Sequence, residues 1–419
     1  MLTFFPTPYP GEWWYSVLCR YHVRSGNSKH QSTIKELIPG RITAAIGSVY
    51  PNSTIRQILS GLPDGLLSVR DVIIRHTLFP YYSRFSPFEK KAAMLEQLSR
   101  GETIVITSIR KFTAQSVPRY CPQCAAEDRE IYGEAYWHIE HQIPLMMICP
   151  KHGCLLQTAD DIISTHIDYT FYPLESVCPK RELPRSPPDI SPWRASFSHI
   201  LADYQRLSLT ASATPNHSNL AISLSNMGYG IIQNRSLNTI LDAKKLYWDM
   251  IETYGREVVE LIFGGESSIC IINRACKWEI ASPERYALLQ DFARITSDKV
   301  FGAEPQRDRY EDKLLSLQSM GDSYTKKQVQ EQLSITAAQL DILAKRYNIP
   351  PFWREKEGGR TKQIHISLTA EEQQRIARAA AIHGNGQTAV FARDVLLREV
   401  KEILKNDKGD LRNEQRNKG

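Results

Sequence analysis

The chain has 419 residues, of which 42% are apolar and 23% are charged. At a typical domain size of about 150 residues, this length predicts two to four domains, each with enough apolar residues for a core. A peptide and a mostly disordered chain are therefore excluded. The 52 Lys and Arg residues exceed the 46 Asp and Glu residues by six. This excess permits a polyanionic partner without requiring one.

The positive charge is concentrated near the C-terminus. Residues 351–419 contain 14 basic and 10 acidic groups, which supplies +4 of the net charge of +6. The C-terminal part is therefore the first place to look for a nucleic-acid interface. No run of about 18 apolar residues occurs, and Pro6, Pro8 and Pro10 interrupt the start of the chain where a signal peptide would need an apolar segment. We expect a soluble, intracellular protein.

In chain order, residues 12–115 are predicted to form short amphipathic helices, for example 12–24, 54–60 and 89–99. Residues 116–156 are rich in Cys, His, Tyr and Trp. Six prolines between Pro173 and Pro192 exclude a continuous helix there and indicate a crossover or linker. A second helical region follows, with 240–252, 258–263 and 283–295 as its clearest elements.

A metal site is predicted from two closely spaced pairs of ligands, Cys121-x2-Cys124 and Cys149-x2-His152. A two-residue gap lets a tight turn direct both side chains to one point, and four such ligands fill the tetrahedron that zinc prefers. Because protein ligands fill every position, the expected role is structural. Three other residues compete for the ligand roles, namely Cys154, His138 and His141. The remaining cysteines are expected to be small buried apolar residues, and they are Cys19, Cys178, Cys270 and Cys276.

Residues 324–347 predict a helix-turn-helix. Thr325 is expected to cap a helix over 326–333, and Thr336 to cap a second helix over 337–347. The second helix would be offered to the major groove of DNA, with Gln339, Lys345 and Arg346 on its outer face. A helical hairpin within an ordinary protein core remains an equally acceptable interpretation.

Residues 361–404 predict one strand and two helices. Residues 362–368 alternate polar and apolar, Thr369 and Glu372 form a capping box, and a second helix is expected over 389–404. One strand cannot satisfy its own edge, so a dimer that pairs two strands is the natural solution. This resembles the ribbon-helix-helix family, in which paired strands enter the major groove. The residues that would face DNA are Lys362, Gln363, His365 and Ser367. The alternatives are a β-wing of the preceding unit or an interaction hairpin.

Several phrases in the N-terminal part are distinctive when they are taken together. They are Phe5-Pro6-x-Pro8-Tyr9-Pro10-x-Glu12 with the later Arg20, Arg75-His76-Thr77-Leu78-Phe79-Pro80-Tyr81-Tyr82, Arg119-Tyr120-Cys121-Pro122-x-Cys124, Tyr132-Gly133-Glu134-Ala135-Tyr136-Trp137-His138, and Cys149-Pro150-Lys151-His152-Gly153. In this order they resemble the TniQ/TnsD family of transposon target-site selection proteins, and are most similar to the TnsD branch. The resemblance covers about residues 1–156, is weaker over 218–300, and does not include 320–419.

The resemblance implies a protein that chooses where a cut-and-paste transposon inserts. Family members bind a target, which is either an attachment site on DNA or a guide-RNA CRISPR effector complex on DNA, and recruit an AAA+ ATPase that regulates the transposase. Cys121, Cys124, Cys149 and His152 match the family's zinc ligands. Because Cys178 has no companion, we expect one structural Zn²⁺ and not the second zinc of some members. The expected location is the bacterial cytoplasm, on the nucleoid when DNA is bound.

The predicted fold is mainly α and multi-domain. The expected parts are a helical domain (1–115), a zinc-finger module with a proline-rich crossover (116–180), a second helical domain (193–300), a helix-turn-helix (320–355), a ribbon-helix-helix-like unit (356–405) and a disordered tail (406–419). The predicted function is a non-enzymatic selector that binds double-stranded target DNA and recruits an AAA+ regulator. The alternatives are an adaptor for a guide-RNA complex and a zinc-containing transcriptional regulator. No G-x-x-x-x-G-K-[ST] phosphate loop occurs, so ATP hydrolysis is assigned to a partner.

Overall fold

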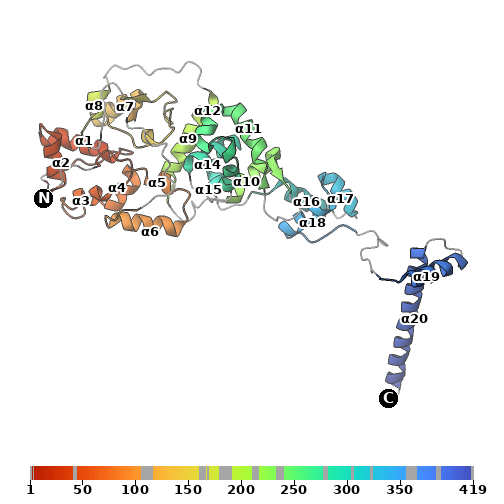
Figure 1. The fold of residues 1–419 in the computed structure, drawn as a ribbon. Helices are drawn as coiled ribbons and strands as arrows, with labels where there is room; N and C mark the ends of the chain where they lie inside the picture. Colours follow the sequence, from red (N-terminus) through yellow and green to blue (C-terminus); the bar gives the residue numbers. More distant parts are fainter. Residues whose placement is uncertain are drawn as a thin grey trace. The chain divides into compact units, whose positions relative to one another are not determined.

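The fold is that of a computed structural model (Figure 1). The structure describes residues 2, 4–40, 45–104, 117–159, 167, 169–178, 191–209, 217–232, 240–276, 282–302, 306–320, 324–354, 366–383 and 388–416. Contacts between Cα atoms divide the chain into two units, Met1–Trp353 and Arg354–Gly419. Within the described residues the fold is mainly helical, as the sequence predicts, and none of these helices is long and apolar enough to cross a membrane.

The N-terminal part of the first unit consists of short helices that precede a small module with the four predicted metal ligands, which is called the metal module below. The helices are α1 (Trp14–Ser25), α2 (His30–Leu37), α3 (Ser53–Leu59), α4 (Val69–His76), α5 (Phe79–Ser83) and α6 (Phe88–Ser99). The module contains β1 (Arg119–Tyr120), α7 (Pro122–Tyr132), η2 (Glu140–Gln142), β2 (Gln157–Thr158) and α8 (Leu174–Val177). Strands β1 and β2 pair antiparallel, with Arg119 opposite Thr158. The predicted helices at 12–24, 54–60 and 89–99 correspond to α1, α3 and α6.

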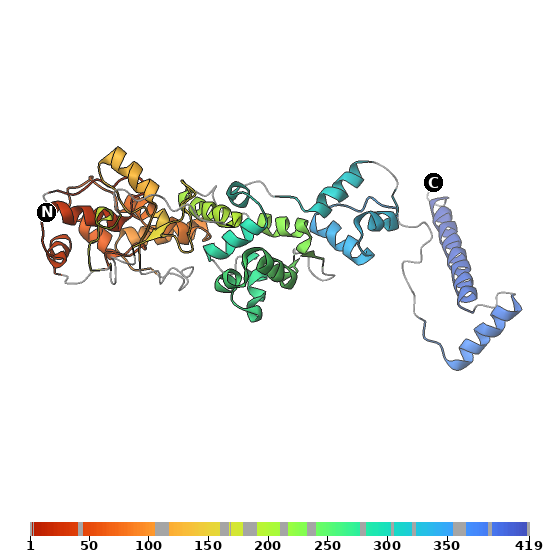
Figure 2. The same cartoon turned by 90° about the horizontal axis from the view of Figure 1, so that it is seen from above.

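A second helical part follows and packs on the first. It contains α9 (Pro192–Arg206), α10 (His217–Leu224), η4 (Ser225–Tyr229), β3 (Gly230–Ile231), β4 (Ile240–Leu241), α11 (Ala243–Tyr254), α12 (Arg256–Phe263), η5 (Glu266–Ser268), α13 (Cys270–Cys276), α14 (Pro283–Phe292) and α15 (Ser297–Phe301). The two views in Figures 1 and 2 show α14 running beside α9, and these two helices are in direct contact. Strands β3 and β4 pair antiparallel just before α11.

One continuous hydrophobic core joins these two parts. Buried apolar residues form a single cluster from Trp13 to Phe301, with Trp13, Trp137 and Tyr204 among its largest members. Helix α1 shows why the N-terminal phrase is needed for this core, because its first eight residues, from Trp14 to Tyr21, are all buried. The helix ends at Gly26, which adopts the left-handed conformation that glycine tolerates best (φ 70°).

Three helices after this core form a smaller core of their own. They are α16 (Arg309–Ser319), α17 (Lys326–Leu333) and α18 (Ala337–Arg346). Leu314 and Leu317 of α16 pack with Val329, Leu340 and Leu343 of the other two helices. Both capping boxes exist, with Thr325 and Gln328 at α17 and Thr336 and Gln339 at α18. The two predicted helices are therefore present as α17 and α18, and α16 packs against them. That they form a DNA-reading helix-turn-helix stays a prediction.

The second unit, residues 354–419, is described here by itself. It contains α19 (Ala370–Ile382), which Thr369 caps together with Glu372, and α20 (Thr388–Arg416). Most of the predicted strand lies outside the described residues, and its described end, 366–368, forms no strand in the single chain. Helix α20 continues over 406–416, where we expected a disordered tail. This segment contains no proline, and its Lys, Arg, Glu, Gln and Leu residues have high helix propensity, which outweighs the low propensity of Gly409 and of four Asn and Asp residues.

Candidate metal centre

The first pair of ligands is held by the N-terminus of α7. Cys121 is the N-cap residue of this helix, and its Sγ atom accepts a hydrogen bond from the backbone N–H of Cys124 at 3.4 Å. Pro122 occupies the first helical position, where its missing N–H costs nothing and its fixed φ favours the helix. Cys124 lies in the first helical turn, so both sulfur atoms are directed to the same side of the helix end. The partial positive charge there favours thiolates.

The second pair of ligands comes from a tight turn. The N–H group of Cys149 donates to the carbonyl of Cys154, and the N–H group of Gly153 donates to the carbonyl of Cys149, both at 2.8 Å. Gly153 has a φ of 67°, in the left-handed region that favours glycine, so this residue allows the chain to reverse. The turn brings His152 back over Cys149.

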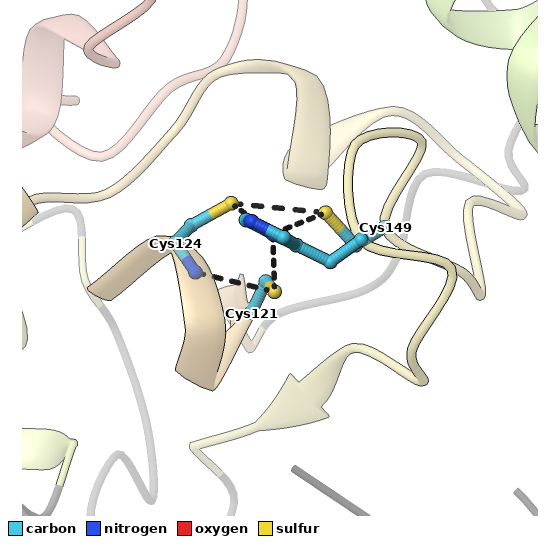
Figure 3. A group of neighbouring side chains, drawn as sticks. Cys121, Cys124 and Cys149 are labelled. Carbon is cyan, nitrogen blue, oxygen red and sulfur yellow. Dashed lines mark hydrogen bonds between the residues drawn. The ribbon is translucent and has the colours of Figure 1, made fainter. Parts of the chain in front are cut away.

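Four of the six distances between the ligand atoms are close to the edges of a tetrahedral zinc site, and all six are within 4.8 Å. The Nδ1 atom of His152 lies 3.5 Å from the Sγ atom of Cys121, 3.3 Å from that of Cys124 and 3.7 Å from that of Cys149. The sulfur atoms of Cys124 and Cys149 are 3.7 Å apart. Zinc bonds of about 2.3 Å to sulfur and 2.0–2.1 Å to nitrogen imply tetrahedral edges of roughly 3.8 Å and 3.6 Å. The cluster, whose cysteines are labelled in Figure 3, could therefore hold one metal ion.

The other ligand candidates lie close to the cluster but outside the tetrahedron. The Sγ atom of Cys154 is 3.3 Å from that of Cys121, but Cys154 does not belong to the group of mutually adjacent ligand atoms. The Nε2 atom of His141 is 3.9 Å from the Sγ atom of Cys124, and burial holds the pKa of this imidazole well below its usual range. His138 instead hydrogen-bonds to Asp128 at 2.9 Å. Hydrogen bonds from neighbouring thiols, first from that of Cys124, lower the pKa of Cys121.

A charged side chain orients the histidine ligand. Glu127 of α7 hydrogen-bonds to the Nε2 atom of His152 at 2.9 Å, and its other oxygen is paired with Lys151. An imidazole that donates its Nε2 proton to a carboxylate presents its unprotonated Nδ1 atom to the metal. Hydrogen bonds from Lys151 and then from His152 lower the pKa of Glu127. Glu127 therefore fixes both the ring orientation and the tautomer that a metal ligand requires.

Three further cysteines whose side chains the structure describes, Cys19, Cys178 and Cys270, are not among the adjacent ligand atoms of this site. Cys19 and Cys178 are buried among apolar residues, as expected. Cys270 is exposed at the start of α13, so the expectation that it is buried was wrong. Its position at a helix end explains the difference, because the apolar face of α13 that packs on the core begins with the following residues. The side chain of Cys276 lies outside the described residues.

A buried ion pair connects the N-terminal segment to the metal module. Arg20 on α1 binds Glu12 through Nη1 at 2.9 Å and Glu134 through Nε at 2.8 Å, and its guanidinium lies 3.6 Å from the ring centroid of Tyr9. Arg24 adds a second contact to Glu134 at 2.5 Å. Glu12 and Arg20 are 0% and 5% exposed. Burial raises the pKa of Glu12 to about 7, although the positive charge of Arg20 opposes the shift.

Backbone hydrogen bonds complete this connection. Trp13 donates to Trp137, and Ile139 donates to Gly11, at 2.8 and 2.9 Å. The segment around Glu12 is thereby paired with residues 137–139, which lie between the two pairs of metal ligands. Sequence reasoning quoted Glu12, Arg20 and Glu134 only as parts of longer phrases and gave them no role. The available signal was a pair of opposite charges, Glu12 and Arg20, in an otherwise apolar helix-forming segment.

The phrase at 75–82 joins the N-terminal part to the second helical part. His76 hydrogen-bonds to the carbonyl of Glu12 at 2.6 Å, and Tyr81 donates to Glu284 of α14 at 3.2 Å. Just after this phrase, the buried Arg84 donates to the carbonyls of Tyr204, Leu207 and Ser208 at the end of α9. Burial lowers the pKa of both His76 and Arg84. The distinctive phrases therefore form a connected polar framework around the metal module.

The predicted DNA-contacting residues have different environments. Gln339 takes part in the capping box of α18, and its amide also donates to the carbonyl of Ile232 at 3.3 Å. Lys345 is exposed, and Arg346 is half-buried against Tyr347. Ser367 is exposed in the second unit, whereas Lys362, Gln363 and His365 lie outside the described residues. Their roles on DNA stay predictions.

Comparisons with known proteins place the distinctive phrases in one family. The family model TniQ matches residues 3–156. A relative from Escherichia coli, the Transposon Tn7 transposition protein TnsD, is 30% identical over 158 residues. This alignment covers 36% of the present chain and 31% of the relative, so the match extends over about a third of each protein. The matched residues include all four metal ligands, the Glu12–Arg20 pair and the phrase at 75–82. Residues 3–156 therefore match the TniQ family model, and the chain is similar to a transposition protein over about a third of its length.

Proposed function

We propose that this protein selects the target site of a transposon. The observation that carries the proposal is the TniQ domain at residues 3–156, together with the similarity to a transposition protein. In the proposed function the chain binds double-stranded target DNA and recruits an AAA+ regulator, which brings the transposase. The chain itself is not an enzyme in this proposal. It contributes recognition and positioning, and the chemistry belongs to its partners.

The proposed cofactor is one structural Zn²⁺ held by Cys121, Cys124, Cys149 and His152. Its support is the close approach of the four ligand atoms, all within 4.8 Å of one another, and the Glu127 carboxylate that hydrogen-bonds to His152. All four positions of a tetrahedron would be filled by protein, which leaves none for a reactive water. The ion would hold α7 against the turn at 149–153. This in turn stabilises the surface that residues 137–139 share with the N-terminal segment.

DNA binding is assigned to the C-terminal part of the chain. Within the first unit, two consecutive capped helices, α17 and α18, support a helix-turn-helix, and Lys345 and Arg346 provide positive charge at the end of α18. Lys326 and Lys327 are paired with Asp341 and Glu331. The exposed residues of α18 include Ala337 and Ala338, which are small enough to permit close approach to a groove. In the second unit, Lys362, Gln363, His365 and Ser367 remain the proposed base-facing residues. Recruitment of the AAA+ regulator is assigned to the N-terminal domain.

A homodimer through the second unit is part of the proposal. Among the described residues of this unit, only Ala380 is a buried apolar residue. Five apolar side chains of α20 are instead 41–59% exposed, and they are Val395, Leu396, Leu397, Val400 and Ile403. Ile366 and Leu368 are also exposed. A unit that cannot bury these side chains within one copy requires a partner, and a second copy supplies an identical apolar face.

The decisive experiment is nuclease footprinting of the full chain on host DNA fragments, with and without the AAA+ regulator from the same transposon. The proposal expects a protected site that the chain alone recognises and that lies at a fixed distance from the insertion point. Protection only in the presence of a guide-RNA complex would instead support the adaptor function. Protection of a promoter, with no binding of the regulator and no insertion nearby, would support a transcriptional regulator.

A further inference from the structure

The second helical part contains a cavity that the proposed function does not use. The cavity has a volume of about 890 Å³ and opens to the surface between α9, η4, α11 and α14. Its lining extends from Pro192 to Ser297 in sequence, and it includes none of the metal ligands and none of the predicted DNA-contacting residues. A cavity of this size, built on helices of the main core, is large enough to accept several side chains of a partner.

One wall of the cavity is aromatic. Trp193 packs edge-to-face on Tyr254 at a centroid distance of 5.1 Å, and Phe292 connects Tyr254 with Tyr229 at 6.2 and 5.7 Å. The hydroxyl group of Tyr229 donates to Asp249 at 2.6 Å, and that of Tyr254 donates to Asp291 at 2.7 Å. These hydrogen bonds fix the two tyrosine rings. The chain's own cations already lie over two of these rings, Arg194 over Trp193 and Lys245 over Tyr229, each 5.1 Å from the ring centroid. A cation from a partner would therefore stack on the half-buried Phe292.

The polar part of the lining is acidic. Arg294 and His199 are the basic groups of the lining, and four carboxylates oppose them, namely Asp203, Asp249, Glu252 and Asp291. Within the part of the chain that the structure describes, none of these four carboxylates forms an ion pair with Lys or Arg. The negative lining contrasts with the net charge of +6 of the whole chain. It repels a nucleic-acid backbone and attracts a basic group.

We propose that this cavity is a docking site for a protein partner that inserts an arginine side chain next to an apolar residue. A guanidinium is planar, so it can stack on the aromatic wall and still donate paired hydrogen bonds to carboxylates at the rim. A lysine ammonium carries the same charge, but it is not planar and cannot stack on an aromatic ring as a guanidinium does. The neighbouring apolar residue of the partner would cover Ile200 and Phe292, which lie in the same lining.

The proposal can be tested by fluorescence polarisation on the full chain. The probe is a fluorescein-labelled peptide with the sequence Gly-Leu-Arg-Leu-Gly, and the matched peptide carries citrulline, a neutral isostere, in place of arginine. We expect the arginine peptide to bind at least tenfold more tightly than the citrulline peptide. A lysine peptide should have intermediate affinity. Absence of binding by the arginine peptide, or equal binding of the arginine and citrulline peptides, overturns the proposal.

Three variants distinguish a built site from general electrostatic attraction. Glu252→Gln removes an exposed carboxylate of the lining and should weaken the affinity for the arginine peptide by about threefold to tenfold. Phe292→Leu keeps every charge but removes one ring of the aromatic wall, and should also weaken binding of the arginine peptide. Glu257→Gln removes an exposed carboxylate of α12 outside the lining, and should have no effect. Equal losses for Glu252→Gln and Glu257→Gln, or unchanged binding in Phe292→Leu, would show that no specific site exists. Thermal melting of each variant verifies its fold.

Discussion

The metal centre provides the sharpest test, through the substitution Cys149→Ser. Cys149 is fully buried, and its Sγ atom lies 3.7 Å from both the Sγ atom of Cys124 and the Nδ1 atom of His152. Serine retains the size of the side chain but is a poor zinc ligand at neutral pH. Three ligands then remain, and the turn at 149–153 loses its attachment to α7. Because metal binding and folding are coupled at such sites, lost affinity is lost stability.

The size of the effect follows from the binding free energy of a structural zinc, about 10–16 kcal/mol in small peptides. Loss of one ligand in four removes about 3 kcal/mol if the ligands contribute equally. For a core as large as the one from Trp13 to Phe301, each kcal/mol lowers the melting temperature by about 2–4 °C. We therefore expect the melting temperature of Cys149→Ser to fall by about 6–12 °C.

Two measurements on anaerobically purified protein verify this expectation. Elemental analysis should find one zinc per wild-type chain and much less in Cys149→Ser, and calorimetry should give the lower melting temperature. Cys270→Ser is the matched control, because Cys270 is exposed and distant in sequence from the site. Cys154→Ser tests the competing ligand and should retain zinc. Absence of zinc from the wild type, or full zinc content and unchanged melting in Cys149→Ser, would refute the reasoning.

Four further predictions concern the buried ion pair and the C-terminal units. Arg20→Met leaves the Glu12 carboxylate buried without its cation, so the free energy of unfolding should fall by about 3–5 kcal/mol in chemical denaturation. The pKa of Glu12 is raised from 4.5 to about 7, so between these pH values the native state binds more protons than the unfolded state. The contribution of Glu12 to the free energy of unfolding therefore falls as the pH rises through that range. Glu12→Gln should flatten that part of the profile of stability against pH. Lys345→Ala should weaken binding to every DNA sequence and should reduce the number of counterions released on binding by about one. Lys299, an exposed lysine of α15, is the control, and Lys299→Ala should leave DNA binding unchanged. Gln363→Ala should lose about 1–3 kcal/mol of binding free energy on the cognate site and little on other DNA in titrations. Ile366→Lys should break the dimer, as light scattering would detect, and should weaken binding to every DNA sequence. A monomeric wild type, with equal losses of cognate and non-cognate binding in Gln363→Ala, contradicts the ribbon interpretation.

The local features of this protein follow from the sequence, because they depend on residues that are close together along the chain. Thr325 and Thr336 cap α17 and α18 as their spacing to Gln328 and Gln339 predicts, and the paired ligands of the metal cluster are recognisable from their two-residue gaps. Short-range spacing fixes which backbone and side-chain atoms can meet within one turn. The order of the phrases likewise indicates the family of residues 3–156 without any structure.

Other features depend on contacts between distant residues and were decided only by the tertiary structure. Tyr81 reaches Glu284 across the core, and Glu12, Arg20 and Glu134 meet although they are far apart in the chain. No local pattern encodes such a pairing, because it arises from how whole helices pack. The same is true of Glu127, which supports His152 from the opposite side of the metal cluster, and of Gln339, whose capping role competes with the DNA contact expected from its position on a helical wheel. A helical wheel places a side chain on a face, but only packing determines which atoms that side chain meets.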